Sequence, residues 1–158
     1  MRIGILSDTH DNMPAIAKAV SVFNDAEVHL VIHAGDLVAP FVSIPLKELK
    51  MEFVAVFGNN DGERIGLSNV FKGKIHRPPY TLDFHGKKIL ILHEPDNLDI
   101  LAESGKFDAI IYGHTHEVDV RKGKTLILNP GECSGWLKGQ RTVALWDVTT
   151  GEVQIIPV

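Results

Sequence analysis

Short apolar runs recur along the first two thirds of the chain, and most of them are apolar on both faces of an extended strand. Strands buried on both faces are typical of parallel sheets that are covered by helices. The pattern therefore predicts buried strands over residues 2–6, 28–33, 53–57, 88–92 and 107–112.

Segments with helical periodicity separate these strands. Residues 14–24 place Ile16, Ala19 and Phe23 on one face, and Pro14 falls in the first turn, where its missing N–H costs little. Further helices are predicted over residues 41–50, 63–71 and 98–104, with a kink or a late start at Pro45 and a C-terminal cap at Gly105.

The pattern changes after the two prolines at 78 and 79. Residues 80–84 alternate between polar and apolar and form a predicted hairpin with the strand that ends at Leu92. Strands without helices between them follow over residues 118–121, 125–128, 142–146 and 152–156. We expect these to form a second, largely antiparallel sheet, so that residues 1–158 make one α/β domain of two packed sheets with helices outside.

Five apolar runs end in side chains that can bind a metal ion, and the donors are Asp8, His10, Asp36, Asn59, His93, His114 and His116. Residues two apart on an extended chain point the same way, so the Asp8/His10 and His114/His116 pairs are each expected to chelate. Taken singly, each stretch also fits an ordinary polar turn. Their recurrence favours a shared site, because the carboxyl ends of parallel strands lie at one edge of a sheet.

The donor set consists of oxygen and imidazole nitrogen without thiolate. Such a set suits Mn²⁺, Fe, Zn²⁺, Ni²⁺ or Co²⁺. Seven donors exceed the needs of one tetrahedral ion, so two ions bridged by a carboxylate are the most economical interpretation.

Composition excludes several other classes of function. The formal net charge of −4, without runs of like charge, predicts no nucleic-acid patch. No apolar segment has the length of a signal peptide core or a membrane span, so we expect a cytoplasmic protein without membrane contact. The single Cys133 has no cue for a nucleophile and is predicted to be a small packed residue.

The motifs together resemble those of the calcineurin-like metallophosphoesterases, and more narrowly the small cap-less phosphodiesterases of the YfcE/MJ0936 type. The matching segments are Asp8-Thr9-His10, Gly35-Asp36, Gly58-Asn59-Asn60-Asp61, His93, Gly113-His114-Thr115-His116 and Asn129-Pro130-Gly131. The resemblance implies a four-layer αββα sandwich of two mixed sheets flanked by helices.

The resemblance also implies a role for each donor. Asp8, His10 and His116 would hold one ion, and Asn59, His93 and His114 the other. Asp36 would bridge them. The implied reaction is hydrolysis of a small phosphodiester by a hydroxide shared between two divalent ions, of which Mn²⁺ is the first expectation, with no catalytic side chain beyond it.

Two positions depart from the family pattern. Asn60 stands where many members have a histidine; we expect Asn60 to bind substrate, but an amide cannot act as a general acid near neutral pH. Substrates with good leaving groups, such as aryl diesters, are therefore expected. Glu94 follows His93 where the family more often has glycine, and is predicted to repel an anion or to support a ligand.

Several assignments remain open on the sequence alone. Asp61 is predicted to cap the next helix rather than to orient its neighbour, and His33 to lie at a strand end behind the ligands. His29, His76 and His85 are assigned to surface or turn positions. A non-catalytic binding scaffold of the retromer type, a phosphomonoesterase and a homo-oligomer remain alternatives.

Overall fold

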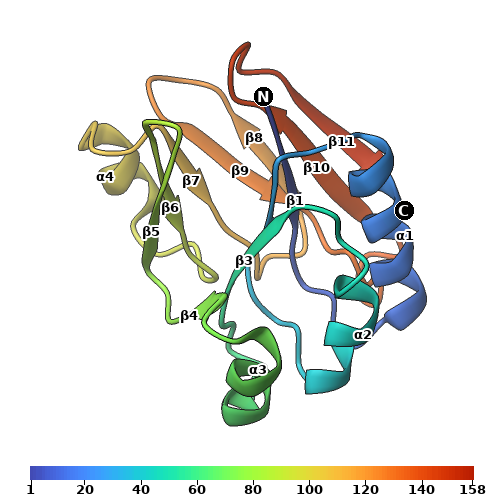
Figure 1. The fold of residues 1–158 in the computed structure, drawn as a ribbon. Coiled ribbons are helices and arrows are strands. Elements are labelled where there is room, and N and C mark those ends of the chain that lie inside the picture. The colour runs from blue at the N-terminus through green and yellow to red at the C-terminus, as the bar shows by residue number, and fades with distance from the viewer.

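Two mixed β-sheets pack face to face in the computed structural model, which describes residues 1–158 (Figure 1). The first sheet has six strands in the order β11-β10-β1-β2-β3-β4. Its parallel part consists of β1 (Arg2–Leu6), β2 (Leu30–His33), β3 (Glu52–Val56) and β4 (Ile75–His76), and its antiparallel part of β10 (Thr142–Asp147) and β11 (Val153–Pro157).

The second sheet has five strands in the order β5-β6-β7-β9-β8. Its central strands run parallel, and its two edge strands run antiparallel to their neighbours. The strands are β5 (Tyr80–Phe84), β6 (Lys87–Ile91), β7 (Ala109–Ile111), β8 (Val118–Arg121) and β9 (Leu126–Pro130).

Four α-helices connect the strands: α1 (Met13–Asp25), α2 (Ser43–Leu46), α3 (Arg64–Phe71) and α4 (Leu98–Glu103), with a 3₁₀ turn η1 (Pro40–Val42) before α2. The Asn12 side chain caps α1 by accepting a hydrogen bond from Ala15 N at 3.2 Å. Pro14 lies in the first turn of α1, as predicted. No helix combines the length and the apolar character that a membrane crossing requires.

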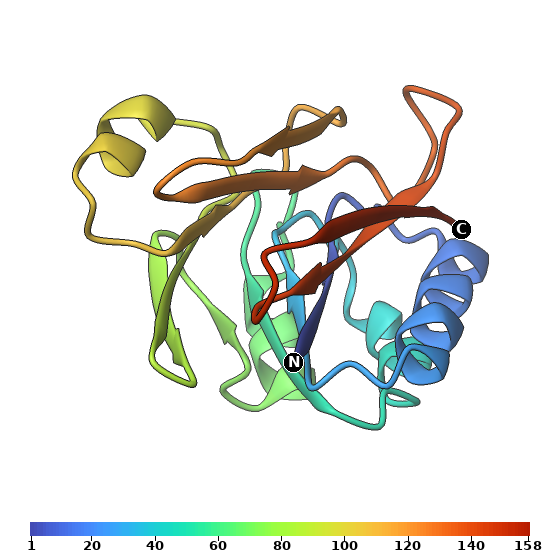
Figure 2. The ribbon, with the colours of Figure 1, turned by 90° about the horizontal axis from the view of Figure 1, so that it is seen from above.

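Three apolar clusters separate four layers. The largest packs α1, α2 and α3 against the outer face of the first sheet, the second fills the space between the sheets, and the smallest lies between the second sheet and α4. Figure 2 shows α1 and α4 on opposite outer sides of the molecule. The predicted αββα sandwich of two mixed sheets is therefore confirmed.

The C-terminal strands do not form the sheet that the sequence pattern suggested. β10 pairs antiparallel with β1, with Trp146 opposite Ile3, so the last hairpin completes the first sheet. The second sheet consequently has a parallel centre and is not largely antiparallel. Alternation of apolar residues identifies a strand but leaves its partner open, because pairing depends on distant contacts.

The helix predicted over residues 41–50 is shorter than expected. A 3₁₀ turn precedes α2, which ends at Leu46 with the Lys47 N–H bonded to Ser43 O. Neither element has a side-chain cap. The short strand β4 was not predicted, since two residues carry no periodic signal.

Candidate metal centre

The seven predicted donors lie together where strands of both sheets end. Asp8 and His10 follow β1, Asp36 follows β2 and Asn59 follows β3, all in the first sheet. His93 follows β6, and the pair His114 and His116 follows β7, in the second sheet. The expectation that one sheet edge would carry all of them is therefore wrong, because the site is built across two sheets.

One group of donors consists of Asp8, His10 and His116, whose candidate ligand atoms lie within 4.8 Å of one another. Asp8 Oδ1 is 3.4 Å from His116 Nε2 and 3.8 Å from His10 Nε2. The two imidazole rings are stacked with centroids 5.2 Å apart. This spacing fits three ligands around one ion.

A second group surrounds His93. Its Nε2 lies 3.3 Å from Asp36 Oδ2 and 2.9 Å from Asn59 Oδ1, and Asn59 Oδ1 lies 2.9 Å from His114 Nδ1. Asp36 Oδ2 is also 3.5 Å from His10 Nε2 in the first group. Asp36 thus stands between the two groups.

Five of the seven donors have a left-handed backbone: Asp8, His10, Asp36, His114 and His116 have φ between 38° and 68°. The predicted chelation by residues two apart on an extended strand is therefore wrong in its geometry. Asp8 and His10 do converge, whereas His114 and His116 lie in different groups. Non-glycine residues adopt this conformation at a cost of about 1–3 kcal/mol each, and such strain is typical of functional sites.

Two glycines make room for the carboxylates. A Cβ on Gly58 would overlap Asp36 Oδ1 and lie 2.5 Å from Asp36 N, and a Cβ on Gly113 would overlap Ser7 Oγ and lie 2.7 Å from Asp8 Oδ2. A side chain larger than hydrogen at either position would displace a ligand loop.

Asp61 supports the ligand loops, and the prediction that it caps α3 is wrong. Its carboxylate accepts hydrogen bonds from Gly58 N at 2.7 Å, Val38 N at 2.7 Å and Asp36 N at 3.1 Å. The N-cap of α3 is Glu63, which makes no side-chain capping bond. Burial raises the pKa of Asp61 despite these bonds. The loops after β2 and β3 are thereby held together.

Burial and charge act in opposite directions on the buried donors. Burial alone would raise the pKa of Asp36, but the hydrogen bonds and charge supplied by His93 and Asn60 hold it well below its usual range. Burial alone would lower the pKa of His93, yet Asp36 raises it. Burial raises the pKa of Asp8, and the Asp36 carboxylate adds to the rise. The candidate ligand atoms of Asp8 and Asp36 lie within 4.8 Å of each other, and two buried carboxylates at this distance favour a bound cation.

The orientation of the donors fits a metal ion. His10 Nε2 is buried and has no hydrogen-bond partner, although it faces both Asp8 and Asp36. His93 Nδ1 lies 2.8 Å from Ala34 O, an arrangement in which Nδ1–H donates to the carbonyl and leaves the lone pair of Nε2 directed at the site. Cys133 takes no part, since it is buried and burial raises the pKa of its thiol to about 12.

Glu132 is a supporting residue that the sequence reasoning missed. Its Oε2 accepts a hydrogen bond from His116 Nδ1 at 2.6 Å, and the carboxylate is itself held by Leu137 N at 3.1 Å and Ser134 Oγ at 3.2 Å. This bond fixes the tautomer of His116 with Nε2 toward Asp8. Spacing along the sequence does not identify Glu132, because its contact with His116 forms only when the loop after β9 folds against the segment after β7.

We expect Glu132→Gln to weaken divalent-ion binding by about 10–100-fold, the usual effect of losing the partner behind a histidine ligand. Calorimetric titration of the metal-free protein measures this. Glu117→Gln is the matched control, because Glu117 is exposed and its one ion pair is with Lys138. Equal affinities in both variants would contradict the role given to Glu132.

The remaining histidines lie outside the donor set. His33 is buried at the end of β2, where its Nδ1 accepts from Gly35 N at 3.2 Å and its Nε2 lies 3.0 Å from Thr9 Oγ1. Its position at a strand end is the predicted one. Burial lowers the pKa of His33 to about 3, so its imidazole is neutral. His29 and His85 are exposed, whereas His76 is half-buried in β4.

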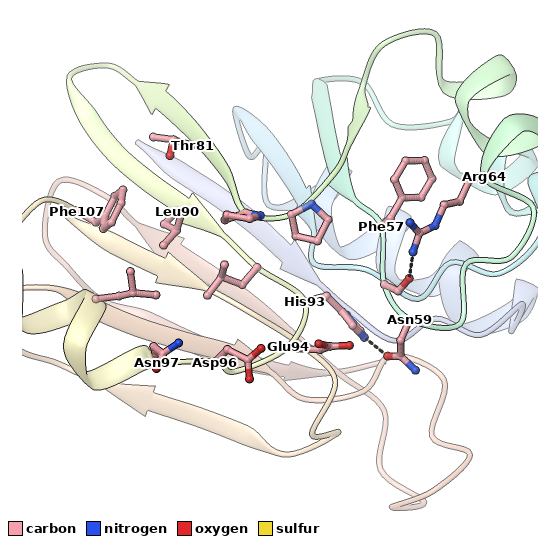
Figure 3. A pocket seen from close by; sticks show the side chains of 15 residues that line it. Phe57, Asn59, Arg64, Thr81, Leu90, His93, Glu94, Asp96, Asn97 and Phe107 are labelled. Carbon is pink, nitrogen blue, oxygen red and sulfur yellow. Dashed lines mark hydrogen bonds between the residues drawn. The ribbon is translucent and has the colours of Figure 1, made fainter.

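The two positions that depart from the family pattern differ in their placement. Asn60 Nδ2 donates to Asp36 Oδ2 and Asn60 N donates to Asp36 Oδ1, both at 2.8 Å. Asn60 thus holds the central carboxylate by two bonds. Glu94 is exposed and lies beside His93 at the edge of a cavity (Figure 3).

Two cavities adjoin the donors. One of about 500 Å³ borders His10, Asn60 and His116 and is bounded by the exposed side chains of Trp136 and Leu137. The indole N–H of Trp136 donates to His10 O at 3.2 Å. The other cavity, of about 550 Å³, begins at Asn59 and His93 (Figure 3). The donors are therefore reachable from two sides.

Comparison with known proteins agrees with this geometry. The model of the calcineurin-like phosphoesterase superfamily domain matches residues 1–151. Phosphodiesterase MJ0936 of Methanocaldococcus jannaschii is 41% identical over 164 residues, which cover 99% of this chain and 98% of the relative.

Solved structures extend the comparison. A structure described as a novel archaeal phosphodiesterase has a TM-score of 0.93 and 38% identity, and the match covers 100% of both chains. Vps29 of Chaetomium thermophilum has a TM-score of 0.71 at 16% identity over 100% of this chain and 95% of that one, which shows a shared fold alone.

The family match, the phosphodiesterase relative and the grouped donors agree on the class of the protein. The chain belongs to the calcineurin-like phosphoesterase superfamily and is a metal-dependent phosphoester hydrolase.

Proposed function

We propose that the protein is a phosphodiesterase with two divalent ions, held by Asp8, His10 and His116 on one side and by Asn59, His93 and His114 on the other. The observation that carries the proposal is the position of Asp36 Oδ2, 3.5 Å from His10 Nε2 and 3.3 Å from His93 Nε2. A carboxylate oxygen at this point can bridge two ions.

When bound, such ions make a water acidic enough to attack phosphorus at neutral pH and stabilise the charge that develops on the phosphoryl oxygens. Other residues of the protein orient the metal-binding side chains. Glu132 fixes His116, Asp61 fixes the loops after β2 and β3, and Asn60 holds Asp36. The nitrogen and oxygen donors, without thiolate, are compatible with Mn²⁺, which we propose as the ion.

The two cavities support a diester as the substrate. A diester carries two organic groups, and a cavity adjoins the donors at His10 and His116 as well as at Asn59 and His93. A monoester would leave one of them empty. It also carries an additional negative charge near neutral pH, and no lysine or arginine lines the cavity beside His10.

The decisive experiment compares hydrolysis of bis-p-nitrophenyl phosphate and p-nitrophenyl phosphate with Mn²⁺ and with EDTA. We expect Mn²⁺-dependent cleavage with a clear preference for the diester, and two ions per chain by elemental analysis. His116→Ala should remove most of this activity and His29→Ala, at an exposed position, should not. Equal rates for wild type and His116→Ala, or preference for the monoester, would contradict the proposal.

A binding scaffold is the second candidate, and the fold shared with Vps29 supports it. A scaffold has no need for seven converging donors, and this chain keeps all of them. Cleavage that requires added metal and the intact donor set separates the two candidates.

The amide at position 60 leads to a prediction about leaving groups. An asparagine can donate a hydrogen bond but not a proton, so Asn60→His should raise turnover of alkyl diesters, whose leaving group needs protonation, more than that of aryl diesters. Rates for a dialkyl and a diaryl phosphate, measured with both proteins, test this. An equal change for the two substrates would show that position 60 does not act on the leaving oxygen.

A further inference from the structure

The cavity that begins at Asn59 and His93 extends well beyond the donors. It has a volume of about 550 Å³ and runs between the end of β3, the segment before β5 and the region under α4 (Figure 3). Cavities of this size are typical of sites for small organic ligands. The donors occupy only one end of it, so most of the space is available to a part of the substrate other than the phosphoryl group.

Five hydrophobic side chains form one part of the wall of this cavity. Four of them, Leu90, Leu92, Leu101 and Phe107, belong to the cluster between the second sheet and α4, and the fifth is Phe57. Pro78 and Pro79 also line the cavity. An apolar group placed against these side chains would lose contact with water.

Carboxylates outnumber cations in the lining of the cavity. Glu94 and Asp96 line it, and neither makes an ion pair or a side-chain hydrogen bond. The one cation in the lining, Arg64, is already engaged: its Nε donates to Asp61 O at 3.1 Å and its Nη2 to Gly58 O at 3.2 Å. Its guanidinium also lies 5.2 Å from the centroid of the Phe57 ring.

We propose that this cavity binds one ester group of the substrate and selects groups that are apolar and carry no negative charge. The inference rests on the proposed phosphodiesterase function. It adds the chemical class of the alcohol that forms this ester group. Diesters with a second phosphate or a carboxylate on that alcohol would be disfavoured, because two free carboxylates face the cavity against a single cation, Arg64, whose guanidinium is held by backbone carbonyls.

Three p-nitrophenyl phosphodiesters test the proposal, with methyl, 4-methylpentyl or 3-carboxypropyl as the second ester group. Burial of each CH₂ group is worth up to about fourfold in affinity, so kcat/KM for the 4-methylpentyl ester should exceed that for the methyl ester by about tenfold or more. The 3-carboxypropyl ester has the same number of heavy atoms and should lose this advantage. Equal kcat/KM for all three would overturn the proposal.

Two sets of variants assign the preference to the cavity. Thr81 is exposed on β5 and lines the cavity, so Thr81→Trp should fill it and lower kcat/KM for the 4-methylpentyl ester more than for the methyl ester. Gln154→Trp, at an exposed position of β11 outside the cavity, is the control. Glu94→Gln with Asp96→Asn should restore cleavage of the 3-carboxypropyl ester, whereas Glu103→Gln on α4 should not. If Thr81→Trp lowered kcat/KM for the 4-methylpentyl and methyl esters by the same factor, the assignment to this cavity would be overturned.

A binding measurement separates this inference from the proposed function. Titration of the metal-free protein with 4-methylpentanol, followed by NMR of leucine methyl groups, should shift Leu92 and Leu101 in the wild type and not in Thr81→Trp. If no ester is hydrolysed, the phosphodiesterase proposal fails and this titration still decides whether the cavity binds apolar alcohols. Unchanged Leu92 and Leu101 signals in the wild type would overturn the cavity proposal.

Discussion

Replacement of Asp36 by asparagine is expected to lower the Mn²⁺-dependent kcat/KM by at least about 10²–10³-fold, the usual effect of removing one preorganised electrostatic group. Asp36 Oδ2 lies between His10 Nε2 and His93 Nε2, so the substitution takes a charge from both groups of donors. Elemental analysis of the variant should find fewer than two ions per chain. Wild-type activity and metal content in Asp36→Asn would rule out a bridging carboxylate.

The same variant is expected to keep its fold. Asparagine has nearly the size of aspartate, and its Oδ1 can still accept the hydrogen bond from Asn60 N. In EDTA the melting temperature should therefore lie within about 2–4 °C of the wild-type value, the shift that about 1 kcal/mol produces in a domain of this size. A larger fall would mean that lost stability, and not lost charge, explains the lost activity.

Gly58→Ala is expected to have the second large effect, and here stability and activity should fall together. The added Cβ would overlap Asp36 Oδ1 and approach the backbone of the same residue, so the loop after β2 must move. Overpacking of this kind typically costs about 1–3 kcal/mol. The displaced Asp36 should also bind metal less well.

Gly62→Ala is the matched control for this prediction. Gly62 lies in the same loop, is exposed, and has no atom within 4 Å of the position of an added Cβ. Denaturant unfolding and metal titration of both variants give the comparison. Wild-type stability and affinity in Gly58→Ala, or an equal loss in both variants, would show that close approach of Asp36 to Gly58 is unimportant.

The donors were predictable from the sequence because each is attached to a strong local signal. An apolar run followed at once by a carboxylate, amide or imidazole marks a strand end, and the structure brings all seven such side chains together. The layers could be predicted for the same reason, since buried strands and amphipathic helices are patterns of neighbouring residues.

The features that could not be predicted depend on contacts between distant segments. β10 pairs with β1, which lies near the other end of the sequence. Glu132, in the loop after β9, contacts His116. Asp61 was assigned to a cap because it precedes a helix, whereas its carboxylate accepts backbone N–H groups of Gly58, Asp36 and Val38. Chelation by the paired donors was likewise derived from extended backbone, and the left-handed conformations at Asp8 and His10 depend on the folded loops.

The distribution of the donors over both sheets affects how the loaded protein opens. Asp36 follows β2 in the first sheet and His93 follows β6 in the second, so ions held between them would cross-link the two layers. Separation of the sheets would then require release of the ions, and unfolding would become slower as coordination became tighter. Amide hydrogen exchange in β2 and β6 would slow on metal loading, while exchange in α4, which packs only on the outer face of the second sheet, would keep its rate.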